Sequence, residues 1–169
     1  QKKVNKSQNY AIIVQNELTD GDSLIYSLNI IKDKYPNILI EEYTDSINSN
    51  IRFVSGQIDD DYGLNKLAFK YRSFEQKSEW MTRPLSIKKN ENSQLFSYLV
   101  HFDSLGVMPG QGLEYYFEVW DNDQVNGNKS TRSSKKQYLA PSIEELEQEK
   151  NSENESLKQK MEQTQKLAA

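Results

Sequence analysis

The sequence predicts an all-β chain that forms an antiparallel β-sandwich and continues into a C-terminal α-helical extension. Several short segments alternate apolar and polar residues with a period of two, which is the pattern of half-buried strands. Turn-forming residues separate these segments, and no helical period lies between them. The chain also holds ten Tyr, six Phe and two Trp among its 169 residues, and β-strands favour such side chains.

The first strands are expected on either side of a polar turn. Residues 10–14 form an apolar run, and residues 24–30 alternate in character. Between them, residues 19–22 read Thr-Asp-Gly-Asp, which is a turn signal. Pro36 then closes this hairpin-like unit.

Six further strands are expected, at residues 37–43, 51–58, 64–74, 96–102 and 113–119 and between residues 130 and 139. In the clearest of them, Leu67, Phe69 and Tyr71 alternate with basic residues, which predicts one buried face and one wet face. Phe117 shares the same inward register in its own strand. The last strand alternates weakly, as expected of a sheet edge.

The composition changes abruptly at Pro141, where a helix is expected to begin. The sequence Ser-Ile-Glu-Glu from Ser142 is a capping box, in which Ser142 and Glu145 each accept a hydrogen bond from the backbone of the other. Good helix formers follow over residues 142–165. Their apolar stripe is thin, since it consists of Ile143, Leu146, Leu157 and Met161. Such a helix packs weakly on its own, so we interpret it as the start of a longer helical region.

Composition excludes several classes of protein. The chain has no cysteine, which rules out disulfides, thiolate metal sites and cysteine nucleophiles. Its net charge is −4, and the region from Ser142 onward carries seven Glu and four Lys. The remaining body is therefore close to neutral and shows no basic face of the kind that binds nucleic acid. No apolar run approaches the roughly 20 residues of a membrane span, and no signal peptide opens the chain.

Three stretches carry a resemblance to a known family. They read FVSGQIDDDYGLNKLAFKYR, SLGVMPGQGLEYYFEVWDNDQVNGNKSTRS and YLAPSIEEL. This pattern resembles a domain-of-unknown-function family of large cell-envelope proteins from Bacteroidetes, which are anchored in the inner membrane near their N-terminus. The resemblance extends over residues 10–146. The chain departs from the family pattern at Asp61, a third acid, and at Gln124, where glycine is common.

The resemblance implies immunoglobulin-like modules followed by a long Gln- and Glu-rich helical region, and it implies no reaction. On this basis residues 1–35 are the closing hairpin of a preceding β module, or extra strands of the same sandwich. Residues 37–140 would form one immunoglobulin-like β-sandwich, whose typical size is about 100 residues. Residues 142–165 would begin the helical region, while residues 166–169 resemble a common cloning-vector junction, with a natural helix end as the alternative.

The expected location in the cell follows from the same resemblance. Gln1 is not a natural translation start, so we expect the chain to be an excised soluble piece of a longer protein. That piece would lie in the periplasmic region of an inner-membrane-anchored protein. The membrane would be reached only through segments outside this chain.

The stretch EYYFEVWDNDQVNGNKSTRS, residues 114–133, raises the question of a calcium site. An EF-hand loop that began at Asp121 would need glycine at its sixth position and glutamate at its twelfth. Asn126 and Arg132 stand there instead, so the loop is not an EF-hand. A looser Ca²⁺ site remains open, in which two loops at one end of the sandwich bring together the weak candidate ligands Asp59, Asp61, Asp121 and Asp123. We favour the interpretation that these residues only supply turn conformations.

The sequence predicts no catalytic residue and no cofactor. The adjacent acids of residues 59–61 do not make a catalytic dyad, because consecutive strand residues point to opposite faces. We expect them to belong to a turn in which Gly63 has a positive φ. His101 is the only histidine, and a lone histidine makes a poor metal site and a poor triad member. The chain contains no nucleophile elbow, phosphate loop or dinucleotide fingerprint. We therefore expect a protein that is not an enzyme.

An aromatic platform is the remaining candidate for a binding site. Tyr116 and Trp120 fall on the strand face opposite Phe117, and Trp80 can join them. Such a platform suits sugar stacking or a protein interface, whereas a second buried face against a neighbouring module is the commoner arrangement.

Two functions are consistent with these features. The first is a non-catalytic structural or interaction module that spaces or positions a helical assembly region, with neighbouring modules and helical segments as protein partners. The alternative is a carbohydrate-binding module that uses Trp80, Tyr116 and Trp120.

Overall fold

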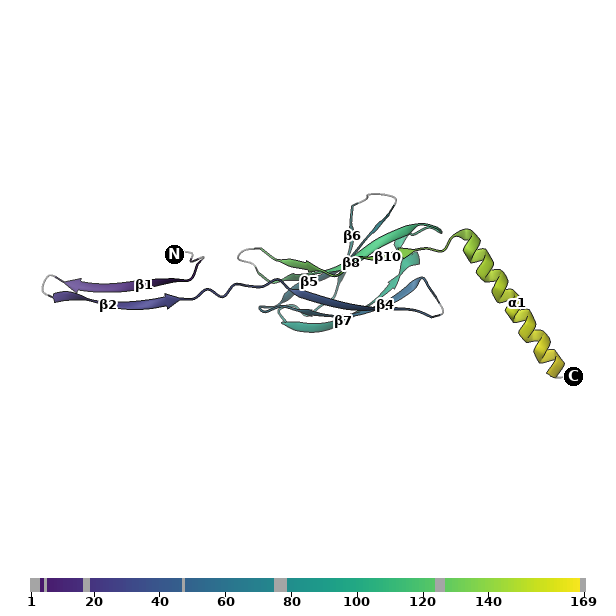
Figure 1. Cartoon of the computed structure of the whole chain (residues 1–169), viewed down its shortest axis with the longest axis horizontal. Coiled ribbons are helices and arrows are strands. Elements are labelled where there is room, and N and C mark those ends of the chain that lie inside the picture. Colours follow the sequence, from purple (N-terminus) through teal and green to yellow (C-terminus); the bar gives the residue numbers. More distant parts are fainter. Residues whose placement is uncertain are drawn as a thin grey trace. The chain divides into compact units, whose positions relative to one another are not determined.

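The computed structural model describes residue 4 and residues 6–16, 19–46, 48–74, 79–123 and 127–167. The chain divides into two units, residues 1–34 and residues 35–169, and each unit is considered by itself. The strands and the helix are labelled in Figure 1.

The first unit is an antiparallel pair of strands, β1 (Gln8–Asn16) and β2 (Thr19–Leu28). Tyr10 lies opposite Tyr26, and their rings stack with centroids 5.2 Å apart. The prediction of a turn at residues 19–22 is wrong, because these residues belong to β2 and Asn16 pairs with Thr19. A shift of register between Val14 and Asn16 keeps this polar segment in the ladder.

The two strands pair only with each other among the described residues. Large apolar side chains on both of their faces, such as Ile13, Val14 and Ile25, are exposed. A two-stranded ribbon of this kind is marginally stable on its own in water. That this ribbon closes a preceding module therefore stays a prediction.

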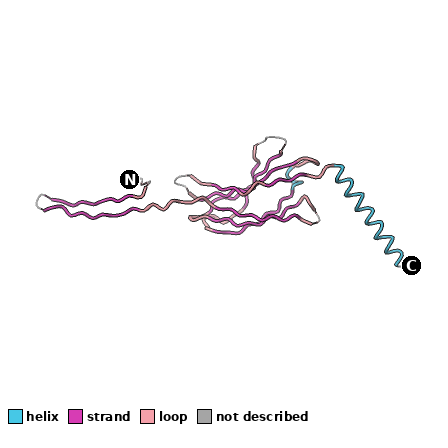
Figure 2. Tube along the Cα trace, viewed as in Figure 1, coloured by secondary structure: helices cyan, strands magenta, loops and turns pink. Residues whose placement is uncertain are grey.

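The second unit is a sandwich-like arrangement of two antiparallel sheets, which Figure 2 shows in magenta. The first sheet has the order β3-β4-β7, with the strands β3 (Asn37–Thr44), β4 (Ile51–Asp59) and β7 (Ser93–His101). The second sheet has the order β10-β8-β5-β6, with the strands β5 (Leu64–Ser73), β6 (Met81–Leu85), β8 (Gly112–Asp121) and β10 (Lys136–Leu139). The short β9 (Ser130–Arg132) also pairs with β8. The predicted all-β architecture is confirmed at this level.

One apolar cluster joins the inner faces of the two sheets. The first sheet contributes Val54, Ile58 and Val100, and the second contributes Phe69 and Phe117, all of them buried. The rings of Phe69 and Phe117 lie 5.3 Å apart at a tilt of 52°, an arrangement that aromatic pairs prefer over face-to-face stacking. The inward register predicted for both residues is confirmed.

Three local features differ from the predictions. Strand β6 was not expected, and it contains Pro84, which an edge strand tolerates because one of its sides is unpaired. The strand expected to reach residue 102 stops at His101, since Phe102 begins a short 3₁₀ helix, η1 (Phe102–Leu105), although its ring remains buried. The single strand expected between residues 130 and 139 is two strands, β9 and β10.

The outer face of the second sheet is only partly exposed to water: Lys66 is exposed there, as predicted for its strand, whereas other outward-facing residues are covered. Ala68, Tyr116 and Glu118 point away from the core, yet all three are buried. The cause is the length of the neighbouring basic side chains, whose apolar stems can cover such a surface while their charged ends stay near water.

The C-terminal element is α1 (Ile143–Leu167), a helix of 25 residues. The predicted capping box is confirmed: the backbone N–H of Ser142 donates to Glu145 Oε2 at 2.7 Å, and the N–H of Glu145 donates to Ser142 Oγ at 3.2 Å. Not one described residue of this helix is buried. Within the described ranges, no helix has both the length and the apolar character that a membrane crossing requires.

Candidate functional site

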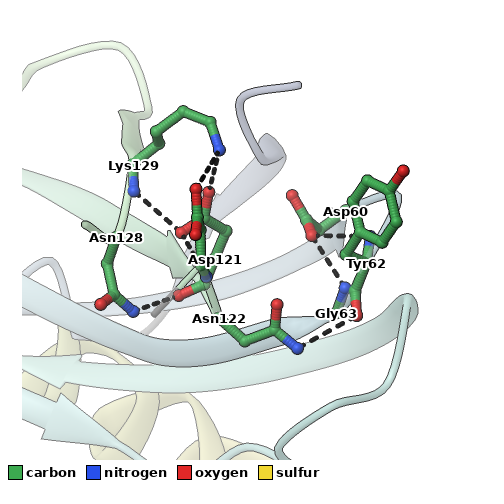
Figure 3. A network of polar contacts seen from close by, with 8 residues as sticks. Asp60, Tyr62, Gly63, Asp121, Asn122, Asn128 and Lys129 are labelled. Carbon is green, nitrogen blue, oxygen red and sulfur yellow. Dashed lines mark hydrogen bonds and ion pairs between the residues drawn. The ribbon is translucent and has the colours of Figure 1, made fainter. Parts of the chain in front are cut away.

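Three segments meet at one end of the sandwich and form what we call the Asp/Asn end, namely residues 60–63, residues 90–92, and residues 121–123 with 127–129. Asn122 links two of them, because its backbone N–H donates to Gly63 O and its side-chain amide donates to Tyr62 O, each at 3.0 Å. The side chain of Asn92 donates to Asp61 O at 2.9 Å and ties in the third loop. Figure 3 shows the part of this network around Asp60 and Asp121.

Asp60 shapes the first of these loops. Its Oδ2 accepts hydrogen bonds from the backbone N–H groups of Tyr62 at 3.0 Å and Gly63 at 2.8 Å. Gly63 has a φ of 122°, a conformation that glycine adopts without strain, so the predicted turn with a left-handed glycine is confirmed. The other carboxylate oxygen, Oδ1, is buried and has no hydrogen-bond partner among the described residues.

The buried position raises the pKa of the Asp60 carboxyl above its ordinary value. Desolvation is the largest cause, and the nearby charges of Asp61 and Asp121 add to it. The two backbone hydrogen bonds act in the opposite direction but do not outweigh burial.

Asp121 closes the third loop. Its Oδ1 accepts from the backbone N–H of Lys129 at 2.8 Å and from that of Asp123 at 3.2 Å. Its Oδ2 lies 2.8 Å from the ammonium nitrogen of Lys129, while its backbone N–H donates to Lys129 O at 3.1 Å. The Asp121 residue is only 1% exposed. These contacts make Asp121 the anchor between the end of β8 and the start of β9.

The candidate Ca²⁺ ligands are only partly brought together. Asp121 and Asp123 both face Lys129, whose ammonium lies 3.8 Å from Asp123 Oδ2. Asp59 lies on β4 and accepts from Ser93 Oγ at 2.6 Å, a bond that lowers the pKa of the Asp59 carboxyl. Asp61 is exposed in the first loop. The residue between them, Asp60, carries the buried oxygen, and the spacing Asp60-Asp61-Tyr62-Gly63 was the sequence signal for it.

The three residues of the aromatic platform lie along the outer face of the second sheet. The ring of Tyr116 meets that of Trp80 edge to face, with centroids 4.5 Å apart. Tyr116 is 1% exposed, so its ring offers no open face to a ligand. The guanidinium of Arg132 also lies over Tyr116, 5.2 Å from the ring centre.

Basic side chains also lie over the rings of the two tryptophans. Arg72 lies 4.5 Å from the centre of Trp80, and Lys66 lies 4.8 Å from the centre of Trp120. Cations at such distances are attracted to the electron-rich face of an aromatic ring. The arrangement therefore brings aromatic rings and cations together on this face.

Glu118 lies at the centre of this face and was not singled out from the sequence. It is 2% exposed. Lys70 Nζ lies 2.8 Å from Oε2, while Arg132 Nε at 3.1 Å and Ser130 Oγ at 2.9 Å donate to Oε1. Burial acts to raise the pKa of the Glu118 carboxyl, but the bonds from these three side chains outweigh it, and the net pKa is lowered. An acid on the outer face of a central strand, beside a lysine one strand away, was the available signal.

The depressed pKa of Glu118 predicts a pH dependence with a definite sign. A carboxyl whose folded pKa lies below its unfolded value of about 4.3 stabilises the fold above that value. The contribution is lost as the pH falls from there through the folded pKa. We expect the stability difference between the wild type and Glu118→Gln to be greatest near neutral pH and to shrink below about pH 4. Urea unfolding from pH 7 to pH 3 measures it, and a difference that grows on acidification would contradict the assignment.

His101 points away from the core and is exposed at the end of β7. The structure describes no ion pair or hydrogen bond that joins its imidazole to a carboxylate.

A comparison with protein-family models and one with curated proteins found no match to this chain.

Proposed function

We propose that this chain is a non-catalytic structural and interaction module of a cell-envelope protein, which positions a helical assembly region. One observation carries the proposal: a capped helix of 25 residues follows the sandwich, and none of its described residues is buried. A helix that gains so little from its own unit is stabilised by contacts with other helices or other chains.

The connection order of the strands supports an immunoglobulin-like module. Counted from residue 37, the first, second and fifth strands form one sheet. The third, fourth and sixth strands form the other, together with the last two strands. Antiparallel sandwiches of about 100 residues with such crossings between sheets are the pattern of immunoglobulin-like domains.

The surface of the helix supports an assembly role. Ile143, Leu157 and Met161 are all exposed. Six of its seven Glu lie in residues 143–155, and three of its four Lys lie in residues 156–167. This order suits the helix dipole, and it also gives the two halves opposite charges. A neighbouring helix in antiparallel orientation would find both an apolar stripe and complementary charge.

The polar groups of the sandwich support a non-catalytic role. Glu118 is held by two cations, and Asp121 is held by Lys129 and two backbone N–H groups. Both carboxylates therefore stabilise the fold through these contacts. The periplasmic address and the inner-membrane anchor rest on the resemblance of the sequence motifs, and fractionation of cells that make the full-length protein tests them.

Hydrogen exchange on the isolated chain tests the role of the helix. We expect the amides of residues 152–165 to exchange almost without protection in dilute solution, while the amides of Leu67 and Phe117 stay protected. The reason is that the helix buries no residue, whereas both strands lie in the centre of their sheet.

A variant in the helix tests whether the helix contributes to the stability of the sandwich. Leu157→Ser should leave the free energy of unfolding of the sandwich within about 0.5 kcal/mol of the wild type, because the side chain is exposed. Strong protection of residues 152–165 in a monomer would show that the helix packs on its own sandwich. The proposed assembly role would then be wrong.

A further inference from the structure

A buried carboxylate oxygen without a partner marks the Asp/Asn end as more than a set of turns. Asp60 is 8% exposed, and its Oδ1 receives no hydrogen bond among the described residues. In Figure 3 this oxygen points away from the turn and toward the side on which Asp121 lies. Burial of an ionised carboxylate is costly unless a cation or hydrogen bonds compensate it. The turn itself needs only the other oxygen, Oδ2, so Oδ1 is free for a ligand.

The spacing of the two acids suits a shared metal ion. Asp60 and Asp121 each offer a carboxylate oxygen, and these two oxygens lie within 4.8 Å of one another. Ca²⁺ binds oxygen ligands at about 2.3–2.6 Å, so two ligands of one ion are at most about 5 Å apart. Two carboxylates at this spacing repel each other unless a cation lies between them.

The acids of the two loops and the lysine that contacts them carry a negative formal charge. Two pairs of acids lie on the two loops, Asp60 with Asp61 and Asp121 with Asp123. Lys129 contacts the second pair, with its ammonium 2.8 Å from Asp121 and 3.8 Å from Asp123. Four carboxylates and one ammonium leave these five residues with a formal charge of −3.

We propose that Asp60 and Asp121 form a Ca²⁺ site at the Asp/Asn end of the sandwich. Asp60 Oδ1 and the Asp121 carboxylate are the two protein ligands, and water completes the coordination. The ligands are oxygen atoms alone, which suits a hard cation rather than Zn²⁺. Mg²⁺ fits less well, because it demands strict octahedral geometry at about 2.0–2.1 Å and gives up its bound water reluctantly.

The site fits a cation at millimolar concentration. Lys129 already occupies one oxygen of Asp121, so Ca²⁺ has to share that carboxylate with an ammonium group. Such competition, together with only two carboxylate ligands, places the expected dissociation constant in the range of extracellular calcium modules, about 10⁻⁴–10⁻³ M.

Thermal unfolding of the whole chain tests the site, with CaCl₂ or MgCl₂ added to protein first treated with EDTA. At Ca²⁺ about ten times the dissociation constant, the melting temperature should rise by about 4–8 °C. Asp60→Asn keeps an oxygen to accept the two backbone bonds of the turn but removes the ionised ligand, so the rise should disappear. Asp61→Asn is the matched control, since it removes a neighbouring charge that is exposed, and it should keep most of the rise.

The response of each variant to Ca²⁺ decides whether the site exists. A rise in the wild type and in Asp61→Asn, absent from Asp60→Asn, supports the site. Calorimetric titration of Ca²⁺ into the wild type at constant temperature should then give one site per chain. No rise in the wild type up to about 10 mM, or an equal rise in Asp60→Asn, overturns it. An equal rise with MgCl₂ would overturn the assignment to Ca²⁺.

Discussion

Replacement of Phe117 by alanine should lower the free energy of unfolding by about 3–5 kcal/mol, the usual cost of truncating a buried phenylalanine. Its side chain is 0% exposed and lies at the centre of β8. The ring is surrounded by those of Phe69, Phe96 and Tyr98, with centroids 5.3, 5.6 and 6.1 Å away. Alanine would leave a cavity where both sheets meet, and three neighbouring rings would lose their contacts.

Urea unfolding at constant pH and temperature measures this loss. Phe53→Ala provides a matched control, because Phe53 is exposed on the outer side of the first sheet, and its truncation should cost less than about 1 kcal/mol. A loss below about 1 kcal/mol for Phe117→Ala would show that its side chain does not fill the core.

Replacement of Lys70 by methionine should destabilise the sandwich by about 3 kcal/mol, the low end of the range for breaking a buried ion pair. Lys70 is the cation on Glu118 Oε2, an oxygen that lies deep under the outer face. Without it that oxygen stays charged and buried, while Arg132 and Ser130 continue to hold Oε1. Methionine keeps most of the apolar stem that covers the face.

A double-mutant cycle isolates the ion pair from the packing. The variant Lys70→Met/Glu118→Leu removes both charges, and we expect it to be more stable than Lys70→Met alone by at least 1 kcal/mol, since no buried charge is left unpaired. Equal stabilities of Lys70→Met and the double variant would show that a Glu118 carboxylate without Lys70 is not costly, which contradicts the prediction. Chemical unfolding of all four proteins in the same buffer gives the coupling energy.

The parts of the fold that local periodicity controls could be predicted from the sequence. Phe69 and Phe117 lie inside because alternation along one strand places them there, and the cap of α1 depends on Ser142 and Glu145 alone. Strand β6 escaped prediction because Pro84 argues against a strand unless the edge position is known.

The candidate sites were harder to predict because they depend on pairing between distant segments. Glu118 is buried only because β5 brings Lys70 beside it and β9 brings Arg132. Asp60 Oδ1 is a candidate metal ligand only because the fold brings Asp121, 61 positions further along the chain, close to it. No local sequence pattern predicts the contacts of Glu118 or the proximity of Asp60 to Asp121. The turn at Gly63, in contrast, could be predicted from the sequence.

The position of the first and last strands of the sandwich has a mechanical consequence. β3 begins at Asn37, beside Asp59 and the Asp/Asn end, while β10 ends at Leu139, which pairs with Gly112 at the opposite end of β8. The two strands also belong to different sheets. Tension applied along the chain therefore pulls each strand lengthwise against its neighbour, so the hydrogen bonds of a ladder bear the force together. β3 holds with eight residues and β10 with only four, so a force that arrives through α1 would detach β10 first and leave the rest of the sandwich closed.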